Sequence, residues 1–139
     1  FDETLPIIKA ISAFASGCGT AFQLQDDILG IVGDEEALGK PVGSDIREGK
    51  RTTIVLQAYK NATQAERDKL TSILGDTGAS QTDIATATTM LRDLGGIDYT
   101  VKLAKRYVES AIENLDVIPP SRYRDLLGFW ADYMVNREF

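Results

Sequence analysis

The sequence predicts an all-α protein that forms one domain over residues 1–139, and three observations support this prediction. Apolar residues recur at three- and four-residue steps in several segments, as they do on a helix with one buried face. The apolar and polar alternation that marks a strand is poor along the chain. At 139 residues and 43% hydrophobic residues, the chain is long enough for one core and short for two. We therefore expect a helical bundle.

Six helices are expected in chain order. The first runs from about Pro6 to Val32, because proline suits the first turn of a helix and the apolar steps continue to Val32. The segment from Gly33 to Gly49 is too rich in glycine for regular structure and is expected to be a loop. The other five helices are expected within residues 50–60, 63–75, 80–96, 97–118 and 121–137.

Two of the expected helices begin with capping signatures. Thr63 and Glu66 are three residues apart, which is the spacing of a capping box. Ser80 is the expected N-cap of the next helix, with Asp83 in its first turn. The pair Pro119-Pro120 is expected to end the fifth helix, since proline cannot continue one.

Composition narrows the possible functions. With 15 basic and 21 acidic residues the net charge is −6, which argues against a nucleic-acid backbone as partner. The absence of histidine excludes histidine-based triads and imidazole metal ligands, and the lone Cys18 excludes an intramolecular disulfide. Catalysis would have to use carboxylates, lysines, polar side chains or a hard metal ion. No signal peptide and no membrane span are evident, so we expect a cytoplasmic protein.

A polar stripe interrupts the apolar first helix. Its members are spaced i, i+3, i+4 and i+7, and therefore share one helix face. They are Gln23, Asp26, Asp27 and Gly30. Taken alone, the two adjacent aspartates are best explained as a face turned to solvent, because an unpaired buried carboxylate costs several kcal/mol.

The glycine-rich segment that follows changes this interpretation. "GDEEALGKPVGSDIREGKRT" places Lys40 and Lys50 near several glycines, with Asp45 between the two lysines. Backbone N–H groups and ammonium groups can converge there on one anion, and Asp45 is placed to orient a lysine. Mg²⁺ is commonly bound by one or two carboxylates together with substrate phosphates. The combination predicts a site for a diphosphate and Mg²⁺. The spacing does not fit a P-loop, and the alternating acidic residues of a calcium loop are absent.

"GTAFQLQDDILG" followed by "LGKPVGSDIREGKRT" resembles the second aspartate-rich region of the trans-prenyl diphosphate synthases, such as geranylgeranyl and farnesyl diphosphate synthases. The likeness is greatest to archaeal members. It implies the carboxy-terminal half of an isoprenoid synthase fold. It also implies a Mg²⁺-dependent prenyltransferase that condenses isopentenyl diphosphate with an allylic diphosphate, with a dimer as the usual assembly.

The resemblance assigns roles to seven residues. By position, Asp26 corresponds to the aspartate that binds Mg²⁺ directly, and Asp27 to its supporting neighbour. The other implied roles are diphosphate binding for Lys40, Lys50 and Asp45, contact with the reacting carbon for Gln23, and an aromatic substrate wall for Phe22. Gln23 and Lys40 are the residues expected to act in catalysis.

Two departures from the family pattern bear on activity. Gly30 stands where the family usually has a third aspartate, which leaves one carboxylate fewer on the helix. The first aspartate-rich motif is missing, and no second adjacent Asp-Asp pair occurs in the chain. We therefore expect these 139 residues to be inactive alone. The alternative is a non-catalytic helical subunit or interaction module of the same fold; a terpene cyclase fits less well.

Overall fold

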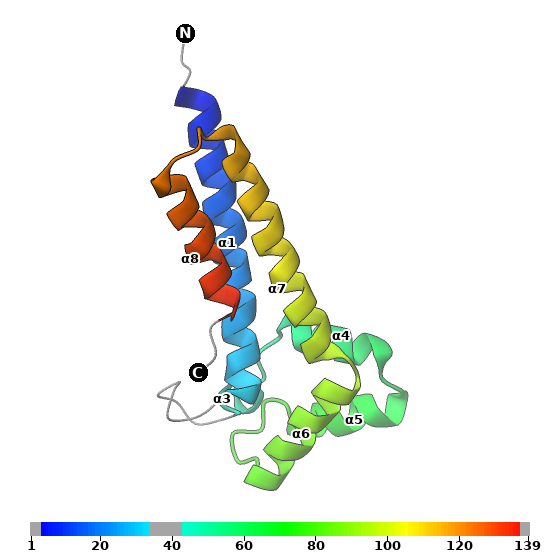
Figure 1. Ribbon diagram of the computed structural model, residues 1–139. Helices are drawn as coiled ribbons and strands as arrows, with labels where there is room; N and C mark the ends of the chain where they lie inside the picture. Colours follow the sequence, from blue (N-terminus) through cyan, green and yellow to red (C-terminus); the bar gives the residue numbers. More distant parts are fainter. Residues whose placement is uncertain (1–3, 34–42, 137–139) are drawn as a thin grey trace. The chain divides into compact units, whose positions relative to one another are not determined.

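The computed structural model describes residues 4–33 and 43–136, which form helices joined by short turns (Figure 1). The elements are α1 (Thr4–Val32), α3 (Ser44–Arg47), α4 (Thr53–Asn61), α5 (Gln64–Ile73), α6 (Gln81–Asp93), α7 (Gly96–Glu113), the 3₁₀ helix η1 (Asn114–Val117) and α8 (Arg122–Asn136). Neither described range contains a strand. The predicted all-α class is confirmed, and an α-helix lies in each of the six predicted segments. The fifth was expected to continue to the proline pair, but it ends at Glu113 and is followed by η1.

The chain divides into two compact units, with boundaries after Gln25 in α1 and after Val101 in α7. The first unit holds the larger part of α1, most of α7, η1 and α8. The second holds the end of α1, the helices α3 to α6 and the start of α7. Each unit has a core of its own, and the single domain over residues 1–139 stays a prediction.

The first unit packs α1 against α7 and α8 through a narrow apolar seam (Figure 1). A Cβ atom at Gly17 would lie 2.9 Å from the Ala111 Cβ, so the lack of a side chain lets α1 and α7 approach closely. Cys18 is buried in this seam, and its burial raises the pKa of the thiol. The buried side chains of the seam are Phe14, Cys18, Ala21, Val108, Ala111, Leu115, Ala131 and Met134.

Many large apolar side chains of the first unit are exposed, including Ile8 on α1 and Phe129 and Trp130 on α8. The segment Leu5–Val32 is long and apolar enough to cross a membrane, a test that the core helix of a soluble protein also passes. This observation is weak evidence for a membrane span.

The second unit holds a larger aliphatic core, drawn from the end of α1 and from α3, α4, α5 and α6. Ile46 of α3 is 1% exposed, and Ile54, Leu70 and Leu91 are fully buried around it. Burial of each such side chain stabilises the fold by roughly 1.5–3 kcal/mol relative to an exposed one. This core fixes α3 beside the end of α1, and it thereby positions the polar residues described below.

The predicted caps are present. The Thr63 hydroxyl accepts from the Glu66 N–H, and the Thr63 N–H donates to Glu66 Oε2 at 2.8 Å. Ser80 and Asp83 make the same reciprocal pair, a full capping box where the sequence indicated only an N-cap and a first-turn acid. These hydrogen bonds lower the pKa of both carboxyl groups, since they favour the charged form.

The prediction of an irregular loop from Gly33 to Gly49 is wrong over residues 44–47, which form α3. Gly43 precedes this helix at a φ of 77°, and Gly49 follows it at 65°, so glycines bound the helix instead of excluding it. Burial of Ile46 supplies the stabilisation that a four-residue helix cannot supply locally. One helical turn is too short to produce a readable apolar periodicity.

Candidate diphosphate and metal site

The two adjacent aspartates of α1 have different surroundings. Asp26 is exposed, whereas Asp27 is 7% exposed and lies beside the aliphatic core of the second unit. Adjacent residues on a helix point about 100° apart, so one member of the pair can be buried while its neighbour stays open to solvent. The pair therefore offers one accessible carboxylate and one that must be satisfied inside the protein.

Lys50 satisfies the buried carboxylate and joins it to a second one. Its Nζ donates to Asp27 Oδ1 at 2.8 Å and to Asp45 Oδ2 at 3.3 Å. Asp45 is in the first turn of α3 and is 5% exposed, while 41% of the Lys50 side chain remains accessible. The Lys50 N–H also donates to the Asp45 carbonyl oxygen at 3.0 Å, which ties the lysine to α3. We call Asp27, Asp45 and Lys50 the carboxylate–lysine triad.

The triad carries a net charge of −1, with two carboxylates around one ammonium group. The hydrogen bond to Asp27 raises the pKa of Lys50, helped by the charges of Asp27 and Asp45 and opposed by partial burial. Lys50 therefore stays charged throughout the physiological pH range. A half-exposed ammonium held in a fixed position is suited to contact an anion that approaches from solvent.

Gly30 lies one turn after Asp26 and is buried under the triad. A Cβ atom at this position would lie 2.5 Å from Asp45 Oδ2 and 2.8 Å from Asp45 Cγ. Van der Waals contact begins at about 3.5 Å, so residue 30 can carry no side chain while Asp45 stays in place. In the sequence, Gly30 is a member of the polar stripe and stands where a third aspartate is usual, and nothing in the local sequence signals this contact.

The structure describes two of the three remaining predicted site residues. Phe22 and Gln23 are exposed on α1, within the first unit, and Phe22 is 39% exposed. Lys40 lies outside the described residues. Their assigned roles in substrate contact and catalysis stay predictions.

The donor set fits a magnesium ion only when other ligands complete its coordination. In the described part of the chain, no group of three or more histidine, cysteine, aspartate or glutamate residues could hold a metal ion. Mg²⁺ is usually bound by one or two carboxylates, with waters and substrate phosphates as the other ligands. The exposed Asp26, which lies beside the charged triad, supplies one such carboxylate.

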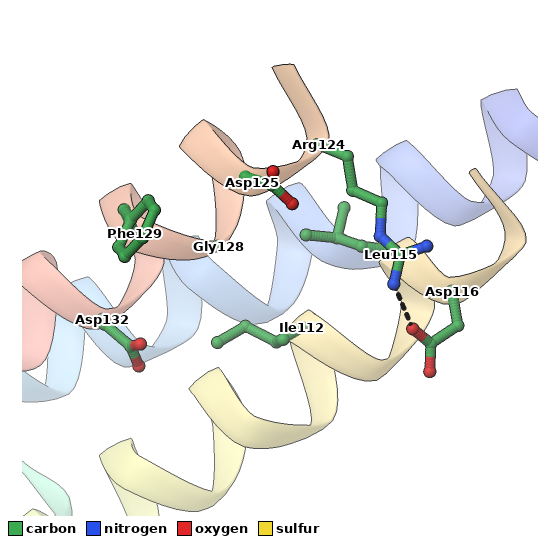
Figure 2. A pocket seen from close by; sticks show the side chains of 8 residues that line it. All are labelled: Ile112, Leu115, Asp116, Arg124, Asp125, Gly128, Phe129 and Asp132. Carbon is green, nitrogen blue, oxygen red and sulfur yellow. Dashed lines mark hydrogen bonds and ion pairs between the residues drawn. The ribbon is translucent and has the colours of Figure 1, made fainter. Parts of the chain in front are cut away.

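A separate hollow of about 370 Å³ lies in the first unit, between the end of α7, η1 and α8 (Figure 2). Arg124 Nη2 donates to Asp116 Oδ1 at 2.6 Å, and Arg124 Nη1 donates to the Ile118 carbonyl oxygen at 3.0 Å. Figure 2 shows Asp125 and Asp132 on α8, about two turns apart. Arg124 therefore ties η1 to α8, a contact that the sequence pattern did not reveal. The acidic lining is unsuited to a diphosphate.

The family model for polyprenyl synthetases matches residues 2–91. The chain belongs to the polyprenyl synthetase family. The matched residues include every member of the predicted polar site, and the family expected from "QDDILG" and "GKPVGSDIREGK" is thereby confirmed.

Curated relatives agree with the family match. The chain is 44% identical over 133 residues to the geranylgeranyl diphosphate synthase of Saccharolobus solfataricus, covering 94% of this chain and 40% of that protein. It is 40% identical over 131 residues to a short chain isoprenyl diphosphate synthase of Methanothermobacter thermautotrophicus, with the same two coverages. The chain thus spans about two fifths of the length of these relatives.

Solved structures show the same helical fold. A geranylgeranyl pyrophosphate synthetase from Pyrococcus horikoshii aligns with a TM-score of 0.87 at 39% identity, over 96% of this chain and 40% of that chain. A geranylgeranyl pyrophosphate synthase from Corynebacterium glutamicum, complexed with isoprenyl diphosphate and magnesium, aligns with a TM-score of 0.90 at 32% identity, over 96% of this chain and 38% of that one.

Proposed function

We propose that the residues of this chain form part of a Mg²⁺-dependent prenyltransferase that condenses isopentenyl diphosphate with an allylic diphosphate. The observation that carries the proposal is the carboxylate–lysine triad beside the exposed Asp26. The magnesium and isoprenyl diphosphate bound by the Corynebacterium glutamicum relative agree with the chemistry of these side chains.

The side chains divide the work by charge. Asp26 offers hard oxygen atoms to a cation. The neighbouring Asp27 accepts a hydrogen bond from the Lys50 ammonium and holds it in place. Lys50 and Lys40 bind the diphosphate through charge-assisted hydrogen bonds. Asp45 orients Lys50 from the other side. Gln23 faces the reacting carbon, and Phe22 excludes water from it.

Magnesium, when bound, would neutralise the diphosphate and make it a better leaving group. Asp26 is the residue that would hold it, and Asp27 would support it from the neighbouring position through its hydrogen bond with Lys50. The contribution of the protein is to fix negative and positive groups in advance, so that little reorganisation is needed as charge develops on the departing diphosphate. Such chemistry needs no histidine, in agreement with the composition.

The proposed partners are isopentenyl diphosphate and the allylic diphosphate, with a second copy of the protein in a dimer. The proposed location is the cytoplasm, without a membrane span or a nucleic-acid partner. The names of the curated relatives, a geranylgeranyl diphosphate synthase and a short chain isoprenyl diphosphate synthase, support the diphosphate partners.

The test is prenyl transfer by the full-length gene product, with Asp26→Ala as the variant. We expect the rate to fall by at least about a hundredfold, because a group that stabilises charge in the transition state is lost. The control is Asp68→Ala, which removes an exposed aspartate of α5 that hydrogen-bonds to Gln64. This control should retain wild-type activity. A loss under tenfold for Asp26→Ala would exclude the metal assignment, and no transfer by the wild-type protein would exclude the function.

A further inference from the structure

Gly30 and Asp45 belong to different helices but compete for the same volume. Gly30 is in α1, on the face that carries Asp26 and Asp27, and Asp45 approaches that face from α3. A Cβ atom at residue 30 would lie 2.5, 2.8 and 3.1 Å from three atoms of the Asp45 carboxylate. All three distances are too short for ordinary contact.

Asp45 has little freedom to avoid such a clash. The residue is 5% exposed, and its Oδ2 accepts the hydrogen bond from Lys50. Its backbone carbonyl also accepts from the Lys50 N–H, while the adjacent Ile46 is 1% exposed in the core. Packed interiors transmit a displacement of this kind to their neighbours. A side chain at residue 30 would therefore displace the Asp45 carboxylate and release its hold on Lys50.

The glycine carries a cost that calls for an explanation. Glycine inside a helix is less stable than alanine, because its backbone loses more freedom on folding. Gly19 lies in the same helix, and a Cβ atom there would meet nothing within 4 Å. Space around the helix therefore requires glycine at residue 30 but not at residue 19.

We propose that Gly30 and Asp45 are a matched pair, in which the absence of a side chain at residue 30 admits the carboxylate that holds Lys50 against Asp27. Asp45 is then a positioning residue that acts through Lys50. It also brings a third carboxylate to the face of Asp26 and Asp27 from α3. The role of Lys50 toward diphosphate rests on the proposed function, whereas the steric pairing does not.

The steric part is tested by thermal unfolding of four variants of the full-length protein. Gly30→Ala should lower the unfolding midpoint by about 3 °C or more, although alanine is the better helix former. The matched control, Gly19→Ala, should leave the midpoint unchanged or raise it. The double variant Gly30→Ala/Asp45→Ala should have a higher unfolding midpoint than Asp45→Ala alone. A Gly30→Ala change with the same sign in both backgrounds would overturn the pairing.

The positioning part is tested without substrate. Hydrogen bonds to two carboxylates slow the exchange of the Lys50 ammonium protons with water, so its ¹⁵N–¹H signal should be observable in the wild-type protein and lost in Asp45→Asn. This variant keeps the shape of the side chain and removes its charge. An unchanged ammonium signal would exclude a positioning role for Asp45.

Binding of inorganic diphosphate in the presence of Mg²⁺ supplies the third measurement. Affinity should fall roughly tenfold in Asp45→Asn and in Gly30→Ala. The double variant Gly30→Ala/Asp45→Ala should have a higher unfolding midpoint than Gly30→Ala. Its affinity for diphosphate should nevertheless be as low as that of Asp45→Ala. Wild-type affinity in Asp45→Asn would overturn the role of Asp45 toward diphosphate.

The two proposals fail in different ways. The full-length protein could lack prenyl transfer while Gly30→Ala lowers the unfolding midpoint of the wild type and raises that of Asp45→Ala. This result would exclude the proposed function and support the pairing of Gly30 with Asp45. An active protein in which Gly30→Ala behaves like Gly19→Ala would keep the function and exclude the pairing. If Gly30→Ala alone fails to fold while the double variant with Asp45→Ala folds, the pairing is supported.

Discussion

At the scale of single residues, neighbouring aspartates have separate tasks. Asp27 is buried and bonded to Lys50, so its replacement by asparagine leaves the ammonium with Asp45 as its charged partner. We expect Asp27→Asn to lower the free energy of unfolding by about 1 kcal/mol, the scale of a partly exposed ion pair. Asp26→Asn should change it by under about 0.5 kcal/mol, because Asp26 is exposed.

Chemical denaturation of the two asparagine variants checks this prediction. The Asp27→Asn effect should shrink at high salt, since screening weakens the part of the ion pair that solvent reaches. Equal losses of stability for both variants would contradict the division of tasks. Diphosphate affinity should fall in both, because each residue serves the same proposed site.

The residue types of the site could be predicted from the sequence, but their spatial relations could not. Adjacent aspartates and a glycine–lysine segment indicated a cation and a diphosphate, and Asp45 was correctly expected to contact a lysine. The meaning of Gly30 was missed, because its contact with Asp45 depends on where α3 packs against α1. A glycine in a helical segment does not by itself indicate which residue packs against it.

At the scale of elements, local chemistry determined what was predictable. The long apolar steps of α1 and the caps of α5 and α6 are encoded within a few neighbouring residues, so periodicity and side-chain type were enough. The turn α3 depends on burial of Ile46 among side chains far away in the sequence. A four-residue helix between two glycines offers no local signal of that kind.

The two capping boxes predict a dependence of stability on pH. Hydrogen bonds from Thr63 and Ser80 lower the pKa of Glu66 and Asp83 below their ordinary values of 4.5 and 3.8. Their contribution to stability is therefore complete above the unfolded pKa values and is lost as the pH falls through the lower, folded ones. Stability should decline as the solution is acidified through and below this range.

Urea unfolding of the double variant Glu66→Gln/Asp83→Asn measures this contribution. The variant should be less stable than wild type at pH 7, and the difference should narrow as the pH falls below 4. Glu109→Gln, an exposed change about one turn before the end of α7, controls for the loss of a negative charge outside an N-terminal cap. A difference that stays constant from pH 7 to pH 3 would contradict the assignment.

At the scale of the whole molecule, the proposed prenyl transfer site is expected to need a second aspartate-rich motif besides the Asp26-Asp27 pair. Its residues include one adjacent Asp-Asp pair, and the chain spans about two fifths of the length of its relatives. We expect a cation held between two carboxylate-bearing faces and a diphosphate to lose protein ligands when one face is absent. The carboxylate–lysine triad is proposed to supply one such face.

We therefore expect the 139-residue chain to transfer prenyl groups at least about a hundredfold more slowly than the full-length gene product, because the loss of even one charge-stabilising group has that scale. Radiolabelled isopentenyl diphosphate with an allylic diphosphate and Mg²⁺ measures both rates under the same conditions. Circular dichroism of the 139-residue chain must show the helical content of α1 to α8, so that a low rate reflects missing groups and not an unfolded protein. Equal rates would mean that the groups within residues 1–139 suffice, and that the expected need for a second aspartate-rich motif is wrong.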